Sequence, residues 1–208
     1  MVEALTSAPP EAIDDHTLML RVREGDIPML GELFQRHARP LYGFFVRLTG
    51  DRAGSDDMVQ QVFHRILRYR HTYRDVGSFT GWMYIIARRV LADFQRHRAQ
   101  HQPPAEEPAL EQLADERTHA ADAAEAGDQT ALLHRALATL PEDVREVIVL
   151  ARFQELPYEE VARILDISLS AVKTRIHRAM KDLRAAYFRI QEIPPMGLPT
   201  ATREKESA

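Results

Sequence analysis

The sequence predicts an all-α protein made of two small helical domains, which a flexible acidic linker joins. Apolar residues recur at helical spacing over residues 13–101 and again over 129–190, and no stretch alternates with the two-residue period of a half-buried strand. Residues 102–128 break the pattern, because they hold several prolines and many acids but few large apolar side chains. We expect residues 1–12 and 191–208 to be disordered tails, since neither carries enough apolar residues to pack.

Four helical stretches are expected in the first domain. Asp14 or Asp15 can cap the first helix, which ends near Gly25. The second helix has Pro28 in its first turn, where the fixed φ of proline is compatible with a helix, and it continues to Gly50. The third and fourth stretches run over about 55–70 and 80–99.

The composition excludes several classes of protein. The chain of 208 residues has no cysteine, which excludes disulfides, cysteine-bound metals and thiol catalysis. Its apolar runs are too short to cross a membrane, and its first residues lack the basic start and apolar core of a signal peptide. We therefore expect a cytoplasmic protein that does not insert into a membrane.

The formal net charge of −4 hides blocks of opposite sign. Residues 63–101 carry eight arginines against two acids, and residues 171–189 carry six basic side chains against one acid. Residues 103–128 between them carry eight acids against one arginine. Two basic regions that flank an acidic one indicate a protein with nucleic-acid partners.

A helix-turn-helix is predicted at residues 158–184. Val161, Ala162 and Leu165 form the apolar stripe of a short helix. Asp166 and the apolar Ile167 make a tight connection, and a serine at 168 is a good N-cap for the next helix. A short helix, a turn and a basic amphipathic helix is the layout that places a recognition helix in the major groove of DNA.

The second helix of this motif has one apolar and one basic face. Val172, Ile176, Ala179 and Leu183 share the apolar face. The side chains on the other face and its flanks can contact base edges or phosphates, and they are Ser170, Lys173, Thr174, Arg175, His177, Arg178 and Lys181. The competing interpretation is a basic, solvated helix in an α-hairpin.

Residues 136–183 resemble the fourth-region domain of extracytoplasmic-function (ECF) sigma factors of bacterial RNA polymerase. The matching motifs are the L-P-x-x-x-R-x-V run at 140–147, Pro-Tyr-Glu-Glu-Val-Ala at 157–162 and Val-Lys-Thr-Arg-Ile-His-Arg-Ala at 172–179. Two positions depart from the family pattern, since Asp166 stands where glycine is usual and Ser170-Ala171 replaces Gly-Thr. Aspartate tolerates a left-handed turn, so we expect the turn to form. The resemblance implies that this domain docks on the minus-thirty-five promoter element.

The resemblance extends to the family's second-region domain at residues 54–99. Residues 56–63, Asp-Asp-Met-Val-Gln-Gln-Val-Phe, resemble the helix that grips the clamp coiled coil of core RNA polymerase. Met58, Val59 and Val62 are expected to pack inward. The polar residues left for contact with the polymerase are Asp56, Asp57, Gln60, Gln61 and Arg65. Gln61 stands where the family usually has glutamate.

Residues 73–89 resemble the stretch that melts promoters and reads the minus-ten element. Aromatic faces can stack unpaired bases and arginines can neutralise phosphates, which is what holding a single strand requires. Trp82 and Phe94 fall on the apolar stripe of their helix and are expected in the core, whereas Tyr73 and Phe79, in the loop, are the better candidates for stacking bases. Gly77 gives the loop freedom to wrap a flipped base. The predicted minus-ten contacts are Tyr73, Arg74, Ser78, Phe79, Arg88, Arg89 and Arg96.

Two other functions fit the sequence less well. A metalloenzyme could use His97 and His101, which are four residues apart, but no glutamate follows the first histidine and no third ligand is near. A stand-alone helix-turn-helix regulator would explain residues 129–190 but would leave the arginine and aromatic stretch of 73–98 without a role.

The sequence is therefore identified as a member of the ECF sigma factors, with no catalytic activity, cofactor or metal expected. The resemblance implies that core RNA polymerase and promoter DNA are its partners and that an anti-sigma factor holds it inactive. It also implies that the acidic linker threads the polymerase near the RNA path, where carboxylates can imitate nucleic acid.

Overall fold

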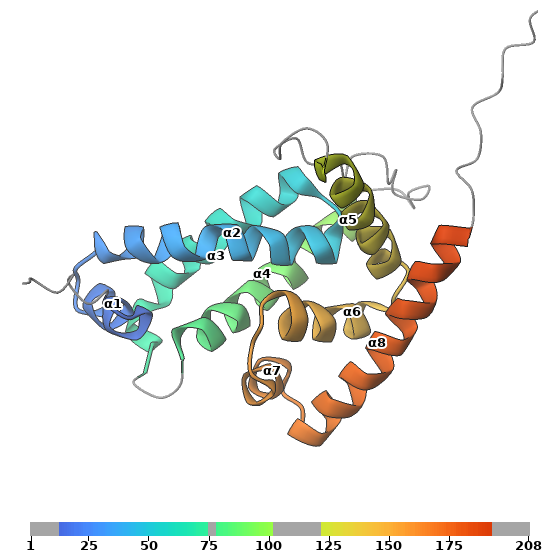
Figure 1. Cartoon of the computed structure of the whole chain (residues 1–208). Coiled ribbons are helices and arrows are strands. Elements are labelled where there is room, and N and C mark those ends of the chain that lie inside the picture. The colour runs from blue at the N-terminus through green and yellow to red at the C-terminus, as the bar shows by residue number, and fades with distance from the viewer. Residues whose placement is uncertain (1–12, 75–77, 102–121, 193–208) are drawn as a thin grey trace, which may run out of the picture.

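The computed structural model describes residues 13–74, 78–101 and 122–192, and all regular structure in these ranges is helical, which confirms the predicted fold class (Figure 1). The elements are α1 (Asp15–Arg23), α2 (Met29–Thr49), α3 (Arg52–Tyr69), η1 (Arg70–Thr72), α4 (Phe79–His101), α5 (Asp122–Ala138), α6 (Glu142–Ile148), η3 (Val149–Phe153), α7 (Tyr158–Leu165) and α8 (Leu169–Glu192).

The ends of the first helices follow the expected capping chemistry. Asp14 caps α1, because its Oδ1 accepts the backbone N–H of Thr17 at 2.8 Å, and this hydrogen bond lowers the pKa of the Asp14 carboxyl. Helix α2 begins directly after Pro28 and ends at Gly50, whose φ of 70° is left-handed. Pro40 lies inside α2, and the helix continues through it as predicted.

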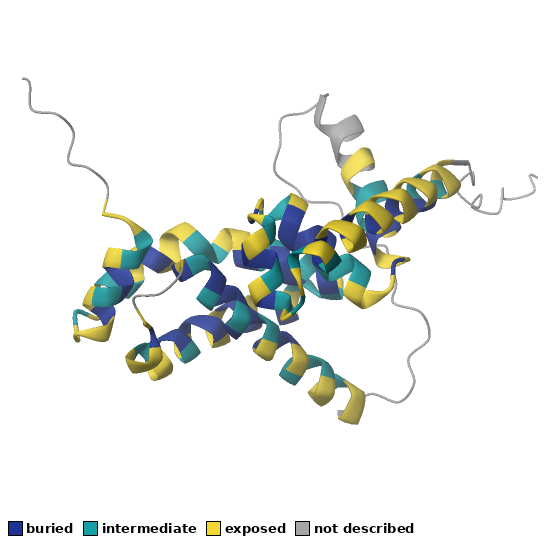
Figure 2. Cartoon of the chain, turned by 90° about the horizontal axis from the view of Figure 1, so that it is seen from below, coloured by how far each residue is buried: buried dark blue, intermediate teal, exposed yellow. Residues whose placement is uncertain are grey.

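Helices α2, α3 and α4 pack together, with α1 at one end of the group (Figure 1). Each contributes a buried apolar stripe to the core, and buried segments alternate with exposed ones along the helices in Figure 2. Members of these stripes include Leu41, Phe44, Met58, Ile66, Met83 and Val90. Phe94, predicted on the inner side of α4, is partly buried against the core.

The second half of the chain is organised around α8, against which α5 and α6 pack. Helix α6 runs without interruption into η3, a π-helical turn. Helix α5 begins at Asp122, inside the segment expected to be linker. Alanines around 120–126 favour helix, and residues near the end of α5, such as Leu137, are held by packing on α8.

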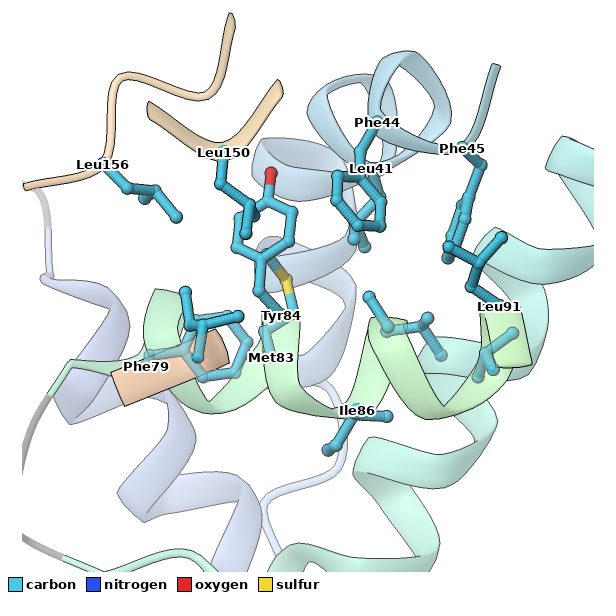
Figure 3. Close-up of a cluster of buried hydrophobic side chains, with 14 of the residues drawn as sticks. Leu41, Phe44, Phe45, Phe79, Met83, Tyr84, Ile86, Leu91, Leu150 and Leu156 are labelled. Carbon is cyan, nitrogen blue, oxygen red and sulfur yellow. The ribbon is translucent and has the colours of Figure 1, made fainter. Parts of the chain in front are cut away.

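The two halves share a core, which the sequence analysis did not predict. Tyr84 of α4 lies between the ring of Phe44, with centroids 5.2 Å apart, and the η3 region, where its hydroxyl donates to Gln154 Oε1 at 2.6 Å. Leu150 and Leu156 point toward the same ring (Figure 3). Burial raises the pKa of the Tyr84 hydroxyl, so it stays a hydrogen-bond donor.

Two arginines lie at the interface between the two halves. The guanidinium of Arg47 on α2 lies 4.5 Å from the ring centroid of Phe153. Arg145 of α6 donates from Nη1 to the carbonyl of Leu48 at 2.9 Å and from Nη2 to the carbonyls of Ala138 and Leu140 at 2.8 and 2.9 Å. The C-terminal parts of α2 and α5 therefore meet at one side chain.

The start of α3 depends on a glycine. A Cβ on Gly54 would lie 2.7 Å from Cζ of Phe94 and 2.8 Å from Oδ2 of Asp51. We expect Gly54→Ala to lower the free energy of unfolding by about 1–3 kcal/mol, because the overpacked ring and cap have to shift. Urea titration checks this. Gly31→Ala is the matched control, since nothing lies within 4 Å of that position in α2. Equal stabilities of the two variants would contradict the predicted crowding.

His134 of α5 makes stability depend on pH. Burial lowers its pKa below the ordinary value of 6.5, and the nearby charges of Arg47 and Arg52 lower it further. The folded state therefore binds this proton less readily than the unfolded state, and the associated stability is present above about pH 6.5 and lost as the pH falls below it. Relative to His134→Gln, the native chain should lose stability from pH 8 to pH 5.5, by at most about 1.4 kcal/mol per pH unit. Urea unfolding of both chains at the two pH values measures the difference.

Candidate nucleic-acid and partner interfaces

Helix α7, a tight turn and α8 form the predicted helix-turn-helix. Asp166 ends α7 in the left-handed conformation, with φ 55° and ψ 48°, and the following N–H of Ile167 donates to the carbonyl of Ala162 at 3.0 Å. The hydroxyl of Ser168 then accepts the N–H of Ala171 at 3.2 Å, which is the predicted N-cap. The turn and the cap together set the direction in which α8 leaves.

The two faces of α8 are divided as predicted. Val172, Ile176, Ala179 and Leu183 are buried. No described residue forms an ion pair with any of the four basic side chains of the outer face, so these are available to phosphates. The exposed candidates are Ser170, Lys173, Thr174, Arg175, His177, Arg178 and Lys181. The hydroxyl of Thr174 donates to the carbonyl of Ser170 at 3.0 Å.

A polar patch covers the outer side of α3. Asp56, Asp57, Gln60 and Gln61 are all exposed on this helix, while the residues between them pack into the core. Arg65, predicted to belong to the same surface, instead donates from Nη2 to Asp93 Oδ2 at 2.6 Å on α4. This hydrogen bond lowers the pKa of Asp93 and ties α3 to α4.

Tyr73 and Phe79, the loop residues predicted to stack bases, are buried, with only 3% and 2% of each residue exposed. The hydroxyl of Tyr73 is 2.8 Å from Nδ1 of His16, and its ring contacts Trp82 with centroids 5.1 Å apart. Phe79 lies against His37, 5.2 Å between centroids. Trp82, predicted in the core, is half-buried instead.

The aromatic cluster thus closes the base of the loop, and its tip, with Gly77, lies outside the described residues. The fixed rings support the loop without presenting a free face for stacking.

The predicted arginines of α4 and its flank differ in their surroundings. Arg74 and Arg89 are exposed, and Arg96 is exposed but paired with Asp93. Arg88 faces the second half of the chain. Its Nε and Nη2 donate to the two carboxylate oxygens of Glu146 at 2.7 and 3.3 Å, and its Nη1 donates to the carbonyl of Ile164 at 2.6 Å. The hydroxyl of Ser78 donates to Oε1 of Glu160.

Glu146 and Glu160 were missed by the sequence analysis. A signal for Glu160 existed, because helical spacing places it beside Ile164 on the inner side of α7, where an acid needs a partner. No nearby sequence pattern indicates a contact for Glu146, because its partner is 58 residues away along the chain.

The part of the chain that the structure describes contains no helix long and apolar enough to span a membrane. The described residues also contain no group of three or more histidine, aspartate or glutamate side chains that could hold a metal ion.

The fold and these surfaces define a two-part helical DNA-binding protein, and both parts match known sequence families. Residues 33–101 match "Sigma-70 region 2" and residues 130–183 match "Sigma-70, region 4". The first range holds the polar patch of α3 and the arginines of α4, and the second holds the helix-turn-helix.

Named relatives share most of this length. The sigma factor CarQ of Myxococcus xanthus is 30% identical over 168 residues, which cover 80% of this chain and 93% of CarQ. The ECF sigma factor SigF of Caulobacter vibrioides is 31% identical over 167 residues, 80% of this chain and 89% of SigF. SigE of Mycolicibacterium smegmatis is 31% identical over 168 residues, but the chain spans only 61% of its length. The chain belongs to the ECF sigma factors of RNA polymerase.

Two solved structures have a similar fold. CnrH, in complex with the cytosolic domain of CnrY, aligns with a TM-score of 0.64 over 86% of this chain and 99% of its own, at 23% identity. The sigma factor RpoE of Bartonella quintana, in complex with the anti-sigma factor NepR, aligns with a TM-score of 0.59 over 75% of this chain and 94% of its own, at 19% identity.

The outer face of α8 predicts a salt-dependent contact. Lys181→Ala should weaken binding to duplex DNA and reduce the slope of log K against log salt by about 0.9, because one phosphate contact fewer releases one counterion fewer. Fluorescence anisotropy with a duplex at several salt concentrations gives the slope. Arg21→Ala, which removes an exposed cation on α1, is the control. If both variants keep the native slope, Lys181 does not contact phosphate.

Proposed function

We propose that this ECF sigma factor binds core RNA polymerase and directs promoter recognition, DNA opening and transcription initiation. The observation that carries the proposal is the outer face of α8, where Lys173, Arg175, Arg178 and Lys181 are exposed and unpaired among the described residues. An unpaired basic face on the second helix of a helix-turn-helix is suited to the major groove, and we assign it to the minus-thirty-five element.

In this proposal the first domain binds the minus-ten strand. Arg74, Arg88, Arg89 and Arg96 supply positive charge along α4 and its flank, which suits the backbone of an opened strand. Tyr73 and Phe79 serve as supports, because their buried rings fix the two ends of the loop that would meet the strand. Ser78 caps α4 beside this loop through its hydroxyl, which accepts the N–H of Gly81 at 3.0 Å.

The polar patch of α3 is assigned to core polymerase. Its exposed acids and amides offer hydrogen bonds on a rigid helix whose inner face is locked in the core. The partner in this proposal is the polymerase clamp, which would place the protein in the cytoplasm. The acidic segment 103–128 would thread the polymerase near the RNA path.

Regulation by an anti-sigma factor is part of the proposal. One similar structure is described as a sigma factor in complex with an anti-sigma factor, and the other as a complex with the cytosolic domain of a second protein. We infer that a partner of this kind also holds the present chain inactive. The protein itself would act by binding, and the chemistry of RNA synthesis would belong to the polymerase.

Gel filtration with purified bacterial core polymerase tests the proposal. The native chain should form a stoichiometric complex at moderate salt. Changing Asp57, Gln60 and Gln61 together to Ala should weaken it by tenfold or more, since each hydrogen bond contributes about 0.5–1.5 kcal/mol. A control variant with Glu32 and Gln35 of α2 changed to Ala should bind as the native chain does, because these exposed residues lie outside the patch.

Failure of this test has a specific meaning. Absence of a polymerase complex, together with tight binding of duplex DNA by the protein alone, would make the chain a stand-alone helix-turn-helix regulator. Equal binding by the native chain and the triple variant would remove the assignment of the α3 patch.

A further inference from the structure

The second half of the chain places a carboxylate against Arg88, one of the predicted strand-opening arginines of α4. Glu146 of α6 receives two hydrogen bonds from Arg88, whose third donor is held by the carbonyl of Ile164 on α7. Glu142 accepts a hydrogen bond from Gln95, which lies about two helical turns beyond Arg88 along α4. All these contacts join residues more than 45 positions apart in sequence, so they form only when the two halves are packed together.

A second carboxylate lies at the N-terminus of α4. Glu160 of α7 is 8% exposed and accepts the hydroxyl hydrogen of Ser78, the residue that caps α4. The start of a helix carries unsatisfied N–H groups and partial positive charge, which favour an anion. Among the described residues, the one cation in an ion pair with Glu160 is Arg163, at 3.3 Å on the same helix.

Guanidinium groups and helix N-termini bind carboxylates and phosphates by the same chemistry. Glu146 and Glu160 therefore hold the groups on α4 that a DNA backbone would use. We propose that the C-terminal half closes over the strand-opening face of the free protein, with these two carboxylates occupying the places of DNA phosphates. The inference rests on the proposed role of α4, because it concerns what competes for that helix.

The interface between the two halves has the properties of a reversible closure. Its apolar part, where Tyr84 meets Leu150 and Leu156, stabilises the closed state. Its polar part is incompletely packed and leaves a cavity of about 480 Å³. Side chains of both halves line this cavity, among them Ile85, Arg89, Ala92, Glu142, Arg163 and Asp166.

The closure is selective for one kind of DNA contact. The outer face of α8 is exposed in the closed chain and free of ion pairs with described residues, whereas Arg88, still 35% exposed, is hydrogen-bonded to Glu146, and the exposed Ser78 is hydrogen-bonded to Glu160. The apparent affinity for a single strand is then the intrinsic affinity multiplied by the fraction of open molecules. Contact with duplex DNA through α8 does not require opening.

Energy transfer between two dyes measures the closure in the full-length chain. The chain has no cysteine, so Gln35→Cys on α2 and Ala185→Cys on α8, both exposed positions, give unique attachment sites. In this background the test variant is E146Q/E160Q, which preserves side-chain shape. The control is D143N/E159Q, which removes the same charge from exposed positions on the same two helices. Circular dichroism verifies that helix content is retained.

The test variant should show lower energy transfer than the native chain. It should also bind a random-sequence single-stranded oligonucleotide about fivefold to tenfold more tightly, because more molecules are open. The control should match the native chain in energy transfer and should gain in single-strand binding only the smaller amount that its change in net charge produces. Binding of a duplex should rise equally in test and control, since that change reflects net charge alone.

Three results would overturn the inference. Equal energy transfer in test and native chains would mean that the carboxylates do not hold the halves together. Lower transfer without tighter single-strand binding would mean that the closure does not mask the strand-opening face. If the affinity of the control for the single strand rose by the same factor, the effect would be due to net charge and not to opening. The polymerase experiment is independent, because a chain that forms no polymerase complex loses the proposed function even when energy transfer reports the closure.

Discussion

Helix α4 is the element on which both halves of the molecule depend, because its buried side chains face the core of the first half and its Tyr84 and Arg88 face the second half. Met83, Val90 and their neighbours fill the core between α2 and α3. Tyr84 and Arg88, one helical repeat apart, point toward the second half. A buried hydroxyl and a half-buried guanidinium both need partners, since an unsatisfied buried polar group is strongly destabilising. Gln154 and Glu146 supply them, and the positions of η3 and α6 follow from that requirement.

The helix-turn-helix is specified more locally. The left-handed conformation at Asp166 and the cap at Ser168 fix the angle between α7 and α8 within a few residues. The apolar stripe of α8 then packs on α7 along its first turns and on α5 and α6 further along. One continuous helix thereby carries the basic outer face and also holds the C-terminal half together.

Much of this could be predicted from the sequence because it depends on nearby residues. Helical periodicity gave the helices and the buried face of α8, and capping chemistry gave the ends at Asp14, Gly50 and Asp166. The burial of Tyr73 and Phe79 could not be predicted, since it depends on His16 and His37 in distant helices. The same holds for the contacts of Glu146 with Arg88, which no local pattern indicates. Sequence periodicity carries the least information about aromatic residues in loops and about acids that seem exposed. Residues of either kind can be bound or buried by an element far along the chain.

Arg145 has a consequence for how the molecule comes apart. Its planar guanidinium binds the carbonyl of Leu48 at the end of α2 and two carbonyls at the end of α5. A lysine could not span these acceptors, since its ammonium is a single point rather than a fork. When the halves separate, Arg145 remains with α5, and the carbonyl of Leu48 in the last turn of α2 exchanges its Arg145 donor for water. The two halves therefore differ in what they lose on separation. The C-terminal half keeps Arg145 as the cap of its helix end, whereas the carbonyl of Leu48 in α2 must bind water.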